Sequence, residues 1–127
     1  MVTAMEAAQK AARKAIERTY QGVLVVTEHR KVKDEQSKLT NYQDVVVLEN
    51  QPCKLSFERL QTAVQSESAA SVAQTTKLFL SPDIVIKANS KITVTQAGVT
   101  MDYKSSGIPA VYQTHQEIIL DLFKGWS

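Results

Sequence analysis

The side chains that most often bind metal ions or act as nucleophiles are few in this sequence and stand apart from one another. His29 and His115 are far apart, and neither has a second histidine or cysteine within four residues. Structural zinc sites need several such ligands at short spacing, so the sequence does not predict a metal site. Cys53 is the single cysteine and cannot form a disulfide within the chain, which fits a protein folded in a reducing cytoplasm. We expect its side chain to be a small buried hydrophobic group.

Nucleotide binding and catalysis are not indicated either. The four glycines are isolated from one another, so none belongs to a glycine-rich loop that could hold phosphates. The carboxylates lie on polar stretches, and no local signature indicates a set of serine, histidine and aspartate. We therefore expect a protein that is not an enzyme and that uses no cofactor.

The length and the charge balance limit the kinds of partner that composition can predict. With 127 residues the chain has room for one domain with a modest core. The formal charge is +2 and 22% of the residues are charged, which is too balanced to require a nucleic acid or a membrane surface as partner. The longest apolar run, Val23 to Val26, is far too short to span a bilayer, so we expect no membrane partner.

Residues 77–103 organise the chain, because apolar residues recur there at every second position between short turns. This period places side chains on one face of a strand. Pro82 lacks a backbone donor and predicts a corner, whereas Asn89 and Gly98 tolerate a positive φ and predict hairpin turns. The alternating residues, which predict an antiparallel meander, are Leu78, Leu80, Ile84, Ile86, Ile92, Val94, Val99, Met101 and Tyr103.

Further strands are predicted on both sides of this meander. The run at residues 44–49 has consecutive β-branched residues, as in a strand that is covered on both faces or lies at a subunit contact. Together these patterns predict a mainly β fold, a small antiparallel β-barrel or sandwich, over residues 20–127. The expected segments are a strand at 22–32, a loop at 33–42, a strand at 44–49, a break at Gln51-Pro52, a strand at 53–57 and a closing strand at 111–123.

Residues 1–19 predict an N-terminal helix appended to the β domain. Thr3 and Glu6 form a capping-box pattern at its start. One face consists of alanines with Ile16 at its margin, which buries little area but lets another backbone approach closely. The helix either covers one end of the β domain or contacts another subunit. The contact residues predicted on it are Ala7, Ala8, Ala11, Lys10, Arg13 and Lys14.

Two further features concern binding surfaces. Residues 59–75 have small, hydrated side chains that cannot order the segment by burial, which predicts a long loop. Near the end of the chain, Phe123 and Trp126 are candidates for a subunit or partner contact, although a terminal tryptophan also packs readily on its own domain.

The segments CKLSF (53–57) and KLFLSPDIVIKANSKITVTQAGVTMDYKSSGIPAVYQTHQEIILDLF (77–123) resemble a family of small proteins of tailed bacteriophages that infect Gram-positive bacteria. These are the head-tail connector proteins, also called head-closure or stopper proteins. The match covers about residues 53–126. Its most specific parts are the SPDIxIKxxSKITV hairpin and the terminal LFxGW.

This resemblance implies a virion structural protein, assembled in the bacterial cytoplasm, that forms a ring of twelve subunits. The ring would bind adaptor or portal proteins above it and a tail-completion or tail-terminator protein below, while genomic DNA passes non-specifically through its channel. The loop between the second and third core strands would point into that channel. The matching residues are Arg59, Gln61, Gln65, Ser66, Glu67, Ser68 and Ser71.

Two alternatives remain open at this point. A tail-terminator or tail-tube subunit of the same virion would share the β architecture and the ring symmetry. A small β-barrel that binds nucleic acid would need exposed aromatic and basic residues, and several of the eight aromatic residues stand at core-phase positions.

Overall fold

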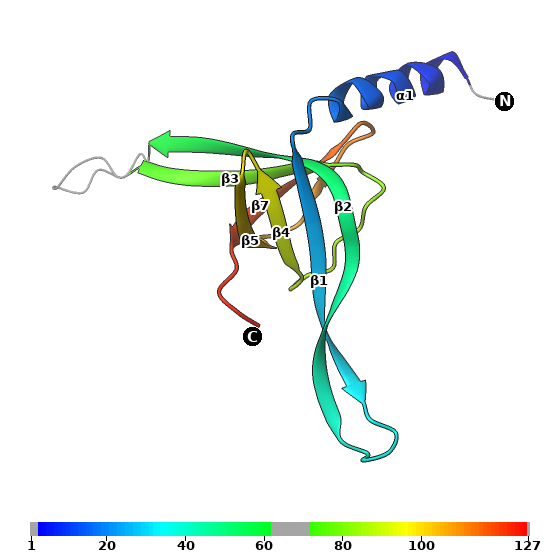
Figure 1. The fold of residues 1–127 in the computed structure, drawn as a ribbon. Helices are drawn as coiled ribbons and strands as arrows, with labels where there is room; N and C mark the ends of the chain where they lie inside the picture. The colour runs from blue at the N-terminus through cyan, green and yellow to red at the C-terminus, as the bar shows by residue number, and fades with distance from the viewer. Residues whose placement is uncertain (1–2, 62–71, 127) are drawn as a thin grey trace.

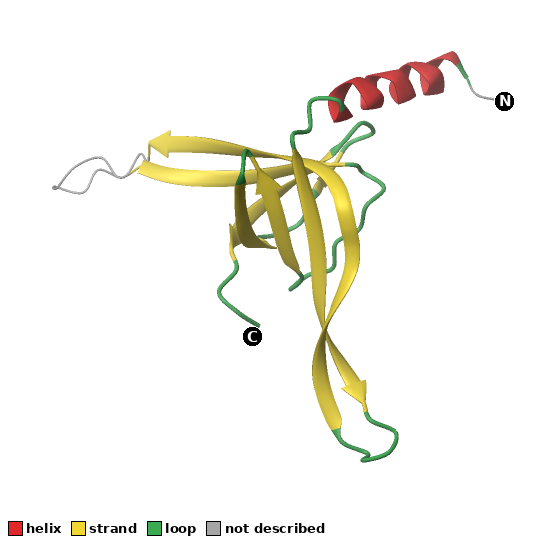
Figure 2. Cartoon of the chain, in the orientation of Figure 1, coloured by secondary structure: helices red, strands yellow, loops and turns green. Residues whose placement is uncertain are grey.

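The computed structural model describes residues 3–61 and 72–126, which form one helix followed by seven strands (Figures 1 and 2). The helix begins where predicted, because the Thr3 hydroxyl accepts a hydrogen bond from the Glu6 N–H at 3.0 Å. The elements are α1 (Ala4–Glu17), β1 (Gly22–Lys33), β2 (Thr40–Gln61), β3 (Val72–Leu80), β4 (Lys91–Gln96), β5 (Val99–Ser105), β6 (Ala110–Val111) and β7 (Gln116–Leu122).

All strand pairings are antiparallel, and they close the sheet on itself. The strand order is β3-β2-β1-β4-β5-β7-β6, and β3 also pairs with β7, so six strands form a closed circuit of backbone hydrogen bonds. Closure leaves these strands with few free edges, since each has a neighbour on both sides within the body. The predicted fold class, mainly β and antiparallel with an N-terminal helix, is confirmed.

The core lies inside this closed sheet and includes five of the alternating residues predicted at 77–103, whereas Val99 and Met101 of the same alternation are exposed. The Cys53 side chain is fully buried, and burial raises the pKa of its thiol to about 12, so the thiol stays protonated at neutral pH. Ile84 and Ile86 pack against the outside of the cluster while partly exposed. The buried hydrophobic residues are Leu24, Val26, Cys53, Leu55, Leu78, Leu80, Ile92, Val94, Tyr103, Ile118 and Leu120.

The predicted strand break at Gln51-Pro52 is wrong, because β2 runs through it as one strand of 22 residues. Pro52 stands opposite Val23, next to an irregularity in the β1–β2 register, and Asn50 takes a positive φ of 54° there. A bulge of this kind bends a strand without ending it, and tolerates a residue that lacks a backbone donor. Beyond this bend, β2 exchanges β1 for β3 as its partner.

Two other expectations differ from the structure. Ile84 and Ile86 lie in an extended crossover that forms no strand, because β3 pairs with β2 and β7 while β4 pairs with β1. Asn89 does take a positive φ of 67°, but its turn ends this crossover and closes no hairpin. The closing strand is split into β6 and β7 by a turn in which the Tyr112 N–H donates to the His115 carbonyl.

The predicted loop at 59–75 is shorter than expected, because β2 continues to Gln61 and β3 begins at Val72. Arg59 pairs with Gln74 and Gln61 with Val72 in a regular ladder. The polar composition concealed these strands, since alternation marks a strand only where one of its faces is buried. Gln65, Ser66, Glu67, Ser68 and Ser71 lie outside the described residues.

The β4–β5 turn offers a stabilising substitution. Ala97 and Gly98 both have a positive φ, 53° and 77°, as in a type I′ hairpin turn. Alanine is strained in this conformation, whereas asparagine tolerates it. We expect Ala97→Asn to raise the free energy of unfolding by about 0.5–1 kcal/mol, measured by urea denaturation. A loss of stability would mean that this backbone geometry is not the one in solution.

Candidate interaction surfaces

Helix α1 turns its alanine face away from the β body. Ala7, Ala8 and Ala11 are exposed, while Arg13 and Ile16 on the other side are partly buried. No residue of the helix is buried, so the helix does not cover the core. The stripe of small residues is therefore open to a neighbour.

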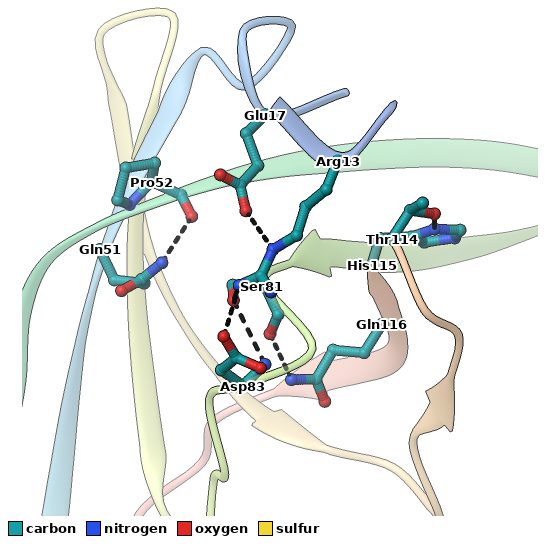
Figure 3. Close-up of polar contacts among 9 residues, drawn as sticks. All are labelled: Arg13, Glu17, Gln51, Pro52, Ser81, Asp83, Thr114, His115 and Gln116. Carbon is teal, nitrogen blue, oxygen red and sulfur yellow. Dashed lines mark hydrogen bonds and ion pairs between the residues drawn. The ribbon is translucent and has the colours of Figure 1, made fainter. Parts of the chain in front are cut away.

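One arginine anchors this helix to the body (Figure 3). Arg13 pairs through its Nε with Glu17 at 3.0 Å and through its Nη2 with Asp83 at 2.7 Å, and it also donates to the Ser81 hydroxyl. The hydrogen bond with Asp83, and next that with Glu17, raises the pKa of Arg13. Arg13, predicted as a subunit contact, thus orients the helix, whereas Lys10 and Lys14 remain exposed.

The hairpin of β1 and β2 extends beyond the closed sheet as a two-stranded arm (Figure 1). β1 pairs with β4 only over 23–27, so residues 28–33 and 40–45 pair only with each other. The tip is ordered by Asp34, whose carboxylate accepts hydrogen bonds from the Gln36 N–H and the Ser37 hydroxyl; these bonds lower the pKa of Asp34. A two-stranded ribbon without a third strand or a covering layer is marginally stable in water.

The hairpin of β2 and β3 forms a second arm. β7 pairs with β3 only from Thr76 onward, so residues 58–61 and 72–75 again lack a third strand. Phe57 stands at the base of this arm with 51% of its surface exposed. Arg59 is exposed on the arm and Gln61 ends β2. Both arms therefore present strand edges that no third strand in the described part of the chain covers.

The C-terminal segment packs against the base of the first arm. Trp126 stacks on His29 with ring centroids 4.8 Å apart, and His29 stacks on Tyr42 at the same distance. Phe123 contacts Trp126 edge to face. The Nδ1 of His29 bonds with Asp44 at 2.8 Å, and this hydrogen bond is the largest cause that lowers the pKa of Asp44. Phe123 and Trp126, predicted as contacts, thus lie together in one aromatic cluster.

A groove of about 610 Å³ runs beside this cluster. It is lined by residues of β1 and β2, of the turn before β4, of β5 and of the C-terminal segment. Sequence reasoning missed it, because its residues come from separate segments and no local spacing connects them. Its charged and aromatic lining residues are Glu28, His29, Arg30, Lys31, Tyr42, Lys87, Lys104, Phe123 and Trp126.

Glu117 on β7 forms a polar cluster with His115 and Lys77, and this cluster gives a pH prediction. Glu117 accepts from His115 at 3.0 Å and pairs with Lys77 at 3.2 Å; the bond with His115, and next that with Lys77, lowers the pKa of Glu117. The ionised Glu117 carboxylate therefore stabilises the fold at pH values above the pKa that this carboxyl has in the unfolded chain. This contribution is lost as the pH falls through the lower pKa that the carboxyl has in the folded protein.

We expect Glu117→Gln to lower stability at pH 7 and to flatten the loss of stability between pH 5 and about pH 3. Urea unfolding at several pH values measures both effects. Glu35→Gln, at the exposed tip of the first arm, is the control and should leave the pH profile unchanged. An unchanged profile for Glu117→Gln as well would contradict the assignment of the lowered pKa to Glu117.

Residues 3–61 and 72–126 contain no group of three or more histidine, cysteine, aspartate or glutamate side chains placed to hold a metal ion. Helix α1, the one helix among these residues, is not long and apolar enough to cross a membrane.

Comparisons with known proteins give one distant structural likeness. No protein-family model and no curated protein matches the chain. A solved structure similar to it is that of the protein xkdH from the phage-like element PBSX of Bacillus subtilis. The two share 14% identity, over 79% of this chain and 91% of that chain, with a TM-score of 0.48. A likeness at this level assigns neither a family nor a function to the chain.

Proposed function

We propose that this chain is a structural subunit of the neck of a tailed bacteriophage. It forms a head-closure, or stopper, ring of twelve copies in the virion, between portal or adaptor proteins on one side and a tail-completion or tail-terminator protein on the other. It acts through assembly and not through catalysis. The resemblance of residues 53–57 and 77–126 to head-tail connector proteins names this role, and the exposed elements of the fold support it.

The observation that carries the proposal is the set of elements that project from the closed sheet. The alanine face of α1 is turned outward, and each of the two arms is a ribbon without a third strand. A monomer gains little from such extensions, since marginal ribbons and small-residue faces are stabilised by packing. In a ring, each copy supplies the missing layer for the next, and closure makes many modest contacts act together.

The apolar surface of β2 next to the first arm agrees with a contact between copies. Val46 and Val47 are 48% and 39% exposed; Val46 stands opposite Thr27, and Val47 is the extra residue where the β1–β2 register shifts. The consecutive β-branched residues at 44–49 predicted a strand that is either covered on both faces or placed at a subunit contact. Because Val46 and Val47 are exposed, this chain does not cover both faces, and we retain the subunit contact. We place a neighbouring subunit against this part of β2.

The second arm is the element that the proposal directs toward the channel. It carries Arg59 beside Glu58, so its described charges nearly balance. A nearly neutral lining lets DNA pass without strong attraction to the phosphates. Residues 62–71, which contain five of the predicted channel residues, connect its two strands.

Light scattering during size-exclusion chromatography tests the assembly. We expect the full chain alone to elute with about twelve times the 14.1 kDa mass of one chain, and with a larger mass when its adaptor protein is bound. A mass of 14.1 kDa under both conditions, at concentrations up to the millimolar range, would contradict the proposal.

A further inference from the structure

The groove beside the C-terminal segment has an excess of positive charge. Arg30 and Lys31 line it from β1, Lys87 from the turn before β4, and Lys104 from β5. The carboxylate among its lining residues is Glu28, which pairs with Arg30 at 2.9 Å and stands 4.0 Å from Lys87. Four cations therefore face one anion, and the lining attracts a polyanion.

A column of stacked rings forms one wall of the same groove. Trp126, His29 and Tyr42 lie nearly parallel, with interplanar angles of 13° and 7° and successive centroids 4.8 Å apart. Tyr42 ends the column with 61% of its surface exposed, so a further planar group has room to stack on it. Lys91 places its Nζ 5.7 Å from the centre of the Phe123 ring but is not one of the residues that line the groove.

We propose that this groove binds a single strand of nucleic acid, whose phosphates contact Arg30, Lys31, Lys87 and Lys104 while one base stacks on Tyr42. Basic side chains along a path beside an aromatic platform are what sequence-independent binding of single strands requires. An acidic peptide would use the cations but would leave the ring column without a role. This activity goes beyond the ring proposal and does not depend on it.

Fluorescence anisotropy with a labelled twelve-residue oligothymidylate tests the site on the full chain. Four phosphate contacts predict that the logarithm of the association constant falls with the logarithm of salt concentration with a slope of about −3. Removing two of the cations in Lys31→Ala/Lys104→Ala should halve this slope and weaken binding about tenfold or more at low salt.

Tyr42→Leu should separate stacking from charge. We expect it to weaken binding about fivefold or more while leaving the salt slope unchanged, because no phosphate contact is lost. The matched control is Lys10→Ala/Lys14→Ala, which removes two exposed cations from α1 and should change binding little. Light scattering of the same samples reports the ring separately, so a failure of either proposal can be recognised by itself.

Several results would contradict the proposed binding of a single strand in this groove. One is the absence of binding at 50 mM salt, and another is an equal loss in the α1 control. Binding of a duplex of the same length as tightly as the single strand would also contradict it, since paired bases cannot stack on Tyr42. Equal binding of polyglutamate would assign the groove to an acidic protein segment instead.

Discussion

Ala8→Glu/Ala11→Glu is expected to abolish ring formation while the β body stays as stable as in the unchanged chain. Both alanines lie on the exposed face of α1, and no residue of this helix is buried. Glutamate is a good helix former, so the free energy of unfolding should change by less than about 0.5 kcal/mol. In the ring, two carboxylates would meet a closely packed neighbour without partners, at a cost of several kcal/mol.

Light scattering and urea denaturation of the same variant measure the two effects separately. The matched control is Met5→Glu/Gln9→Glu, which adds the same charges to the same helix away from the alanine face. We expect this control to form rings. If Ala8→Glu/Ala11→Glu assembled as well as the control, the alanine face would have no part in the ring.

Gln116→Leu should cause the largest loss of stability among the changes considered. Gln116 is 3% exposed, and its Nε2 donates to the carbonyls of Ser81 and Ile84. Leucine has a similar volume but leaves these carbonyls without that donor, although the Ser81 carbonyl keeps a bond from the Ile84 N–H at 3.3 Å. The Ile84 carbonyl is the acceptor left without a partner, and a stranded buried acceptor costs about 1–3 kcal/mol, so we expect a loss of about 1–3 kcal/mol.

The same substitution should also loosen helix α1, because Ser81 and Asp83 hold the Arg13 side chain in the turn that Gln116 supports (Figure 3). Urea denaturation gives the loss of stability, and hydrogen exchange of α1 amides reports the helix. Gln113→Leu, in the exposed turn before β7, is the control and should stay within about 0.5 kcal/mol. A change below about 1 kcal/mol for Gln116→Leu would mean that water replaces the lost donor.

Much of the β fold could be predicted, because the core strands have one buried face and therefore alternate. Leu78 and Leu80 in β3 and Ile92 and Val94 in β4 are all fully buried, as their spacing indicates. The same rule failed at Ile84 and Ile86, since an extended crossover that packs on the core produces the same alternation as a strand.

The second arm could not be predicted, for the opposite reason, whereas the predicted strand at 22–32 did cover the β1 part of the first arm. The ladder between Arg59 and Gln74 lies outside the body of the sheet, so neither strand needs an apolar face there. Pro52 suggested a break because proline lacks a backbone donor. The bulge that accommodates it, with Asn50 at positive φ, depends on the β1 register, which is a long-range feature. Local composition cannot report such pairings.

The candidate surfaces were predicted only in part. Alanine spacing located the open face of α1, but its outward direction depends on the bonds of Arg13 to Ser81 and Asp83, nearly seventy residues away in the chain. The groove had no local signal at all, because Lys31, Lys87 and Lys104 meet only after the sheet closes. Its aromatic wall likewise needs Trp126 to fold back on β1.

A density map of the neck, from virions that contain this chain, tests the ring assignment most directly. The account predicts twelve copies around the DNA channel, each with the alanine face of α1 against another protein chain and the β2–β3 arm directed toward the axis. A neck in which this chain is absent, or stands as isolated copies with both arms and α1 exposed to solvent, would contradict it.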